Sequence, residues 1–151
     1  MEIRVITKEL QNEALELVWK VFLEYEAPDY SEQGIKAFRQ SVIENEEYLN
    51  CIVLYGAYDK EQLKGVIATR NEGSHIALFF VDGKYHKKGI GRSLLNEVVR
   101  KCQSDEITVH SSPYAVEVYR HLGFVETDVE QVEEGIRYTP MKLAKIHFRR
   151  G

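Results

Sequence analysis

The chain has 151 residues, 44% of them hydrophobic and 29% charged, with a formal net charge of -4 at pH 7. This length matches one ordinary domain, and the composition excludes collagen-like, coiled-coil and intrinsically disordered chains. The negative charge disfavours broad nucleic-acid binding. Because the sequence shows no signal peptide, no apolar run of membrane length and no metal-binding cysteine pattern, we expect a cytoplasmic protein with no membrane segment and no metal.

The first half of the chain predicts one strand, two helices and three further strands. Alternating apolar and charged residues indicate a strand over residues 1–7, and Thr7 is placed to cap a helix that stops at residues 27–28. Ser31 is expected to cap the second helix. The three following strands, expected to form an antiparallel meander, cover residues 51–58, 63–70 and 75–81.

The second half predicts two helices and three strands. Apolar residues at helical spacing indicate a helix from residue 90 to about residue 102, and a short strand follows at residues 106–110. Ser112 and Pro113 begin another helix, which Gly123 closes. The last strand pair covers residues 124–131 and 136–143. The expected fold is a single mixed α/β domain over residues 1–151, in the order β-α-α-β-β-β-α-β-α-β-β, with a mostly antiparallel central sheet flanked by helices.

A turn rich in glycine and lysine precedes the predicted helix at residue 90. It reads His86-Lys87-Lys88-Gly89-Ile90-Gly91-Arg92-Ser93. Two glycines one residue apart let the backbone approach a ligand, and the amides at a helix N-terminus attract phosphate. Three basic side chains add positive charge. The turn therefore predicts a phosphate cradle, although glycine in such turns also has a purely structural use.

A second motif covers residues 115–124, and taken alone it indicates a core helix in which Tyr119 is a buried aromatic residue. Together the two motifs resemble the GCN5-related N-acetyltransferase (GNAT) superfamily, over nearly the whole chain. The run from His86 to Gly91 matches the family pattern Gln/Arg-x-x-Gly-x-Gly/Ala, with His86 in the place of Gln or Arg. The run from Tyr119 to Phe124 matches Tyr-x-x-x-Gly-Phe.

The resemblance implies acetyl-coenzyme A (acetyl-CoA) as cofactor, with its pyrophosphate on the backbone of residues 86–91 and its pantetheine along residues 79–81. It further implies that Ser112 faces the cofactor arm, that Tyr119 approaches the sulfur, and that a backbone N–H near Val81 stabilises the oxyanion. The implied cofactor-binding residues are Phe79, Phe80, Val81, His86, Lys87, Lys88, Gly89, Ile90, Gly91, Arg92, Ser93, Ser112 and Tyr119.

The general base of such a reaction is predicted to be His75. Its even spacing from Phe79 and Val81 places the three side chains on one strand face, and an ordinary histidine pKa of ~6.5 suits proton removal near neutrality. The alternative is a strand-end histidine bonded to solvent or to a carboxylate. The acceptor amine is expected beside the first helix-loop-helix, where the candidates are Glu24, Tyr25, Glu26, Asp29 and Tyr30. A solvated loop face explains these residues equally well.

The predicted function is transfer of an acetyl group from acetyl-CoA to a primary amine of a small molecule, peptide or protein. One alternative is a non-catalytic acetyl-CoA sensor, and a less favoured one is acetylation of aminoacyl-tRNA. Acidic residues between 126 and 134 are expected to keep a hairpin soluble. The basic residues Lys142, Lys145, Arg149 and Arg150 can pair with that hairpin within the chain or across a homodimer.

Overall fold

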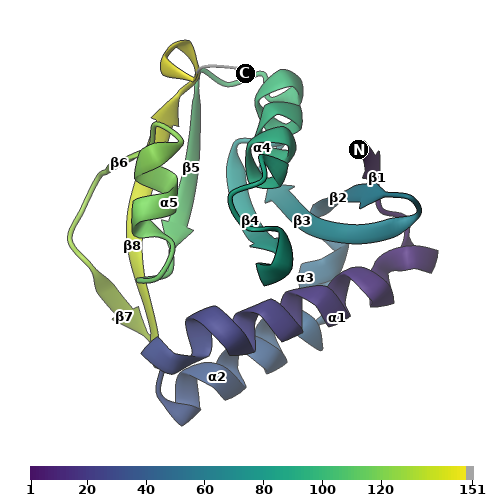
Figure 1. The fold of residues 1–151 in the computed structure, drawn as a ribbon. Coiled ribbons are helices and arrows are strands. Elements are labelled where there is room, and N and C mark those ends of the chain that lie inside the picture. The colour runs from purple at the N-terminus through teal and green to yellow at the C-terminus, as the bar shows by residue number, and fades with distance from the viewer. Residues whose placement is uncertain (149–151) are drawn as a thin grey trace.

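An eight-stranded sheet runs through the protein, whose residues 1–148 are described by a computed structural model. The strand order is β1-β2-β3-β4-β5-β8-β6, and β7 also pairs with β8 (Figure 1). The strands are β1 (Glu2–Val5), β2 (Val53–Asp59), β3 (Gln62–Arg70), β4 (His75–Val81), β5 (Glu106–Ser111), β6 (Val125–Glu126), β7 (Gln131–Glu133) and β8 (Ile136–Ala144). The predicted mixed and mostly antiparallel sheet is confirmed.

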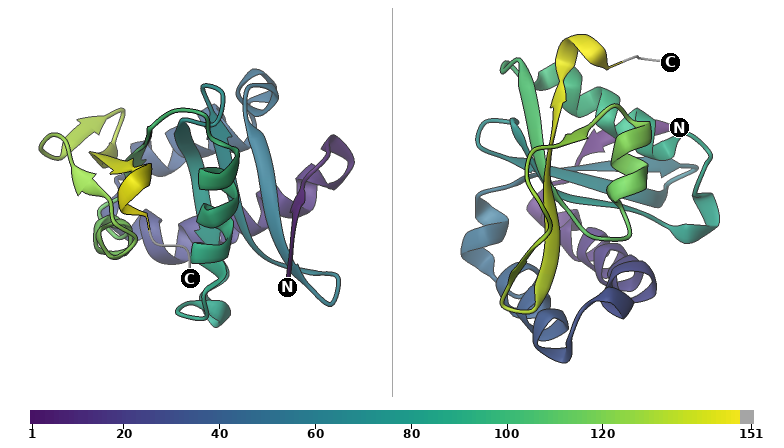
Figure 2. Two further views of the ribbon diagram at one scale, coloured as in Figure 1. Left: turned by 90° about the horizontal axis from the view of Figure 1, so that it is seen from above. Right: turned by 90° about the vertical axis from the view of Figure 1, so that its left-hand side faces the viewer.

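Two groups of helices cover the faces of this sheet (Figure 2). The α-helices are α1 (Gln11–Val21), α2 (Glu32–Phe38), α3 (Glu46–Asn50), α4 (Ile90–Lys101) and α5 (Val116–His121). Short 3-10 turns lie at Lys8–Leu10, Ala27–Asp29, Gly83–Tyr85 and Lys145–His147, and π-helical turns at Phe22–Glu26 and Arg39–Ile43. One core lies between the sheet and α4 with α5, and a second lies between the sheet and α1 with α2.

The pairing of β4 with β5 is the parallel one in the sheet, and it is short. It consists of His75 opposite Thr108 and Ile76 opposite Val109. Beyond Ile76 the two strands separate, as Figure 1 shows. A β-bulge coincides with this point, because Ala68 of β3 pairs with Leu78 while Thr69 pairs with Ile76, and Ala77 is the extra residue. A bulge bends and twists a strand, so β4 turns away from β5 and opens the sheet.

The helical region differs from the prediction in three places. Thr7 is extended but its side chain caps nothing, because a 3-10 turn precedes α1. After α1 the chain widens into the π-helical turn at 22–26 before it ends at Pro28 and Asp29. The sequence analysis did not predict α3, and Cys51 lies in a turn before β2. The predicted cap at Ser31 is confirmed, since its Oγ accepts a hydrogen bond of 3.1 Å from the Gly34 amide.

The C-terminal region also departs from the prediction. The single strand expected at residues 124–131 is replaced by two short strands, β6 and β7. The chain pairs with β8 at Val125–Glu126 and again at Gln131–Glu133. Among residues 1–148, Lys142 and Lys145 do not pair with the acidic hairpin: Lys142 contacts Glu106 at 3.3 Å, and Lys145 donates to the carbonyl of Cys102. Arg149 and Arg150 lie outside the described residues.

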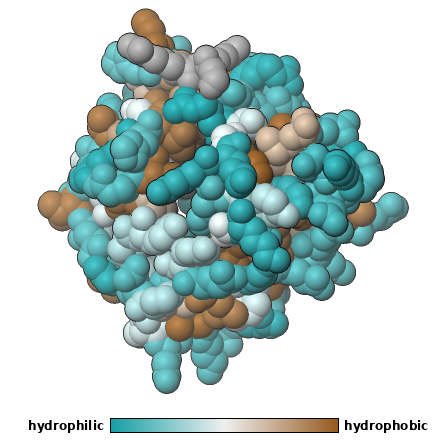
Figure 3. Space-filling model, in the orientation of Figure 1, coloured by the Kyte–Doolittle hydropathy of each residue, from teal (hydrophilic) through white to brown (hydrophobic). Residues whose placement is uncertain are grey.

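Hydrophilic residues cover most of the face shown in Figure 3, where hydrophobic residues form small separate patches. No helix among residues 1–148 is both long and apolar enough to cross a membrane. Within the same residues, no group of three or more histidine, cysteine, aspartate or glutamate side chains is arranged to hold a metal ion.

Candidate active site

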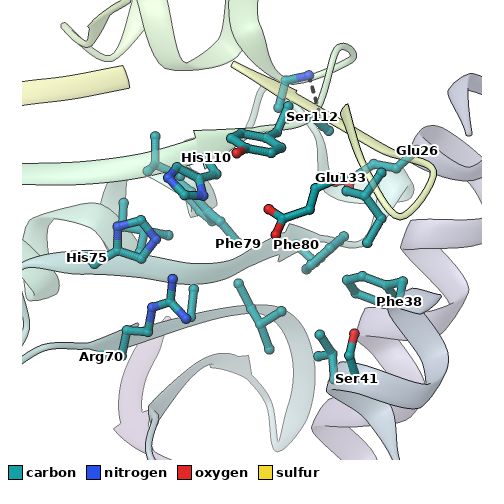
Figure 4. A pocket seen from close by; sticks show the side chains of 18 of the residues that line it. Glu26, Phe38, Ser41, Arg70, His75, Phe79, Phe80, His110, Ser112 and Glu133 are labelled. Carbon is teal, nitrogen blue, oxygen red and sulfur yellow. Dashed lines mark hydrogen bonds between the residues drawn. The ribbon is translucent and has the colours of Figure 1, made fainter. Parts of the chain in front are cut away.

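Two pockets lie where β4 and β5 separate. The first, here called the α4 pocket, has a volume of about 400 Å³ and is lined by the start of α4, by α5 and by the end of β4. The second, the β5 pocket, has a volume of about 330 Å³ and is lined by β3, β4, β5, α2 and the β7–β8 hairpin (Figure 4). Both volumes fall in the range of small-molecule sites. The residues that line both pockets are Glu26, Phe79, Phe80, Ala115 and Tyr119.

The glycine turn shapes the α4 pocket. Gly89 caps α4 in a left-handed conformation, with φ of 83°, which glycine adopts without strain. The first intrahelical bond runs from the Ser93 amide to the Gly89 carbonyl at 3.0 Å, so the amides of residues 90–92 have no acceptor within the helix. A Cβ on Gly91 would stand 3.5 Å from the Phe79 ring, an ordinary contact. Gly91 is therefore not required by packing, and its missing side chain leaves room for a ligand.

The predicted cradle residues divide between the pocket and other places. Lys87, Gly89, Gly91 and Arg92 line the α4 pocket together with His86. The other three do not line it: the Ile90 side chain is buried in the core, and Lys88 and Ser93 lie outside the lining. The roles of these three residues in cofactor binding stay predictions, and the group that Ile90 can offer is its backbone amide.

The open edge of β4 also faces the pockets. The Asp82 amide donates to the Lys64 carbonyl of β3 at 2.9 Å. Because backbone groups alternate in direction along a strand, those of Val81 and Phe79 point away from β3. His86 lies on this open side: its Nε2 is 2.7 Å from the Val81 carbonyl oxygen. A carbonyl can only accept, so Nε2 carries the proton. His86 thus binds the end of β4, a contact within the protein that the family pattern did not suggest.

These features fit a coenzyme A molecule: amides for phosphate, two basic side chains, space above Gly91 and a strand edge for an amide-containing arm. That fit is built mainly from backbone, which explains why His86 can replace the usual Gln or Arg.

Tyr119 of α5 stands at the junction of the two pockets. It is 6% exposed, and its ring meets Phe79 and Phe124 edge-on, with centroids 5.9 and 5.1 Å away. Burial, and next the carboxyl of Glu26, raise the pKa of the phenol far above its ordinary value. The phenol therefore keeps its proton and can donate it in a hydrogen bond. Val118, its neighbour on α5, is 47% exposed and lines the α4 pocket.

Glu26, at the end of the π-helical turn, lies at the same junction. Burial is the main reason that its pKa rises to about 8; nearby Asp29 raises it further, and a hydrogen bond with the Ser112 side chain lowers it. Ser112 is 6% exposed and lines the β5 pocket. That Ser112 faces the cofactor arm stays a prediction; its hydroxyl lies beside Glu26, which lines both pockets. From the sequence Glu26 is an expected acceptor contact, and no local pattern there indicates its raised pKa.

His75 lies in the β5 pocket, but the prediction that it shares a strand face with Phe79 and Val81 is wrong. The bulge at Ala77 reverses the alternation, so that Ile76 packs in the same core as Phe79. The His75 Nδ1 is 2.8 Å from the Thr108 hydroxyl oxygen. Burial, followed by Arg70 and His110, lowers the pKa of His75 to about 4. Its role as general base stays a prediction, and a base this weak is poorly matched to an ammonium group.

The four remaining acceptor-site candidates separate in the structure. Tyr30 lines the β5 pocket, and Tyr25 lines the α4 pocket, where its ring lies 4.9 Å from His86. Glu24 is exposed and lines neither pocket, because it falls on the outer side of the π-helical turn. Asp29 lines neither pocket; its backbone carbonyl accepts a hydrogen bond from Arg137.

The sheet thus splits between β4 and β5, with the amides at the start of α4 on one side and a second pocket on the other. The chain belongs to the GNAT acetyltransferase family: a scan of protein-family models matches the acetyltransferase (GNAT) domain over residues 26–145. A search of curated proteins found no match.

Solved structures share this fold. A GCN5-related N-acetyltransferase from Rhodopseudomonas palustris has a TM-score of 0.81 at 18% identity, covering 95% of this chain and 94% of that chain. The PaiA N-acetyltransferase from Thermoplasma acidophilum, in complex with coenzyme A, has a TM-score of 0.74 at 20% identity, covering 95% and 99%. The apo form of YjaB from Escherichia coli has a TM-score of 0.73 at 21% identity, covering 96% and 97%.

Proposed function

We propose that the protein transfers an acetyl group from acetyl-CoA to a primary amine of a small molecule or peptide. The observation that carries this proposal is the position of Glu26, a carboxyl with a pKa of about 8 on the wall shared by both pockets. An acyl acceptor in the β5 pocket and a donor in the α4 pocket would meet beside it. The coenzyme A complex of the similar PaiA protein supports the same donor.

Each step of the reaction has a group in this chain that suits it. When bound, acetyl-CoA would supply an acetyl group activated as a thioester and a thiol leaving group. Glu26 would take the proton from the acceptor ammonium, since a base is most effective when its pKa lies near the working pH. The backbone amides on the open edge of β4 would bind the developing oxyanion. Tyr119 would donate a hydrogen bond to the departing sulfur.

The amine specificity is supported by the charges around the β5 pocket. Glu133 and Glu134 line it, and these carboxylates favour a cationic acceptor. The same charges oppose a polyanionic acceptor such as aminoacyl-tRNA.

The direct test uses the purified protein with acetyl-CoA and a panel of primary amines. Release of the free thiol is followed together with the mass of the acetylated product, because thiol release alone also reports hydrolysis. Product formation supports the proposal. Tight coenzyme A binding without product from any amine would favour the sensor alternative instead.

Gly91→Asp is expected to reduce coenzyme A affinity at least ~10-fold, because it puts volume and negative charge where the helix amides attract phosphate. Isothermal titration with coenzyme A measures the loss. Gly91→Ala is the graded comparison: its methyl group meets only ordinary contacts, so the melting temperature should stay close to that of the wild type. Wild-type affinity in both variants would mean that the turn has only a structural role.

A further inference from the structure

Arg70 ends β3 and lines the β5 pocket. Its Nε is buried without a hydrogen-bond partner, and within residues 1–148 the guanidinium has neither a hydrogen bond nor an ion pair. Leaving a buried charged donor unpaired is costly. Buried charged donors in proteins are usually hydrogen-bonded to another group of the protein. Where the chain supplies no acceptor, a bound ligand can supply one.

The surroundings of Arg70 leave that role to an anion. His75 pairs with Arg70 across the strands, and its ring lies 5.1 Å from that of His110. Burial and the positive charge of Arg70 lower the pKa of both histidines, so both rings are neutral at physiological pH. Glu133 and Glu134 also line the pocket, yet neither forms an ion pair with Arg70. At this end Arg70 therefore stands beside two neutral imidazoles, and Glu133, whose negative charge raises the pKa of His110, forms no ion pair with Arg70 among residues 1–148.

The opposite end of the pocket is different. In Figure 4, Arg70, His75 and His110 lie together at one end, and Glu26 and Ser112 lie at the other. Phe79 and Phe80, which line this pocket together with Glu26, are four and five residues along β4 from His75. At ~3.3 Å per residue, positions 79 and 80 lie roughly 13–16 Å along the strand from His75. The side chains of Arg70 and Glu26 reach into the pocket from its two ends, which shortens the distance between their charged groups.

From this arrangement we propose that the acceptor carries a carboxylate as well as its amine, and that Arg70 binds the carboxylate while Glu26 faces the amine. This inference rests on the proposed function. The planar guanidinium matches a carboxylate with two parallel hydrogen bonds. Because the two ends are several ångströms apart, the acceptor class is one with a spacer between its two charges: an ω-amino acid or the amino end of a short peptide with a free C-terminus.

The experiment compares matched acceptors with the wild-type protein and two variants. Each ω-amino carboxylate of three to six carbons is paired with the alkylamine of equal length, and glycylglycine is paired with its C-terminal amide. The quantity measured is the ratio of kcat/KM within each pair. Arg70→Gln is expected to lower kcat/KM for the carboxylate acceptor ~10- to 100-fold more than kcat/KM for its counterpart without a carboxylate. The change should lie mainly in KM, because a charge-assisted hydrogen bond to the acceptor is lost. Arg100→Gln removes a surface arginine paired with Glu97 outside both pockets, and should leave the ratios unchanged.

A second measurement does not depend on turnover. Titration calorimetry with hexanoate, in the presence of coenzyme A, is expected to show binding to the wild type and to Arg70→Lys, and loss of binding in Arg70→Gln. If no carboxylate binds and the matched acceptors react equally, Arg70 is not an anion site although the acetyltransferase function stands. If hexanoate binding depends on Arg70 but no amine is acetylated, the anion site stands and the proposed function fails.

Discussion

Replacing Glu26 with glutamine is expected to lower kcat/KM for amine acetylation by ~10²- to 10⁴-fold, the range for a positioned acid–base group. Glutamine keeps the size and polarity of the side chain but cannot take a proton. The measurement is the pH dependence of kcat/KM with an alkylamine whose own pKa, about 10, lies above the range studied. The wild-type profile should bend at about pH 8, the pKa of Glu26, whereas the variant should rise without that bend.

His75→Gln is the matched control for this experiment. Because burial and the charge of Arg70 hold the pKa of His75 near 4, its loss should not remove a bend near pH 8. If His75→Gln abolishes the bend and Glu26→Gln keeps it, the base is His75 and the assignment of Glu26 is incorrect.

The free energy of unfolding provides an independent test of the raised pKa of Glu26. The unfolded chain releases the Glu26 proton near the ordinary pKa of 4.5, and the folded chain keeps it up to about 8. The folded state thus holds more protons between these values, so the stability from this group, complete below pH 4.5, is lost as pH rises to 8. Relative to wild type, Glu26→Gln should become more stable at pH 9 than at pH 5, by on the order of 4 kcal/mol at about 1.4 kcal/mol per pKa unit. Urea unfolding at the two pH values measures this difference.

Tyr119→Phe is expected to slow the chemical step by ~10²- to 10³-fold while leaving coenzyme A affinity and fold nearly intact. The ring contacts with Phe79 and Phe124 remain, and only the hydroxyl that would meet the leaving sulfur is removed. Since the phenol keeps its proton at every working pH, the loss should be independent of pH. Single-turnover measurement at saturating acetyl-CoA is required, because slow product release would hide part of the effect.

Tyr55→Phe serves as the control, since Tyr55 is 7% exposed and lines neither pocket. It removes a buried-ring hydroxyl at a distance from the junction and should leave the chemical step unchanged. A Tyr119→Phe variant with wild-type single-turnover rates would exclude the hydroxyl from the reaction and leave the ring as a packing residue.

Local sequence signals determined most of the fold. Hydrophobic patterns located β3, β4, β5 and α4 to within a residue or two, because α4 buries one apolar face against a core and the central strands β3 and β4 bury apolar side chains in both cores. The glycine turn before α4 was recognisable for a similar reason: the left-handed conformation of Gly89 is a requirement of backbone geometry that glycine satisfies without strain.

The arrangement of the active site was decided by tertiary structure. The bulge at Ala77 reversed the face of His75, because a single extra residue shifts every later side chain to the other side. The π-helical turn brought Glu26 to the junction, and burial there raised its pKa to about 8. Arg70 is an unremarkable strand-end residue in the sequence, and only the folded chain shows that its Nε is buried with no hydrogen-bond partner among residues 1–148. Burial, proton affinity and unpaired charge depend on residues far apart in the chain, so no local pattern encodes them.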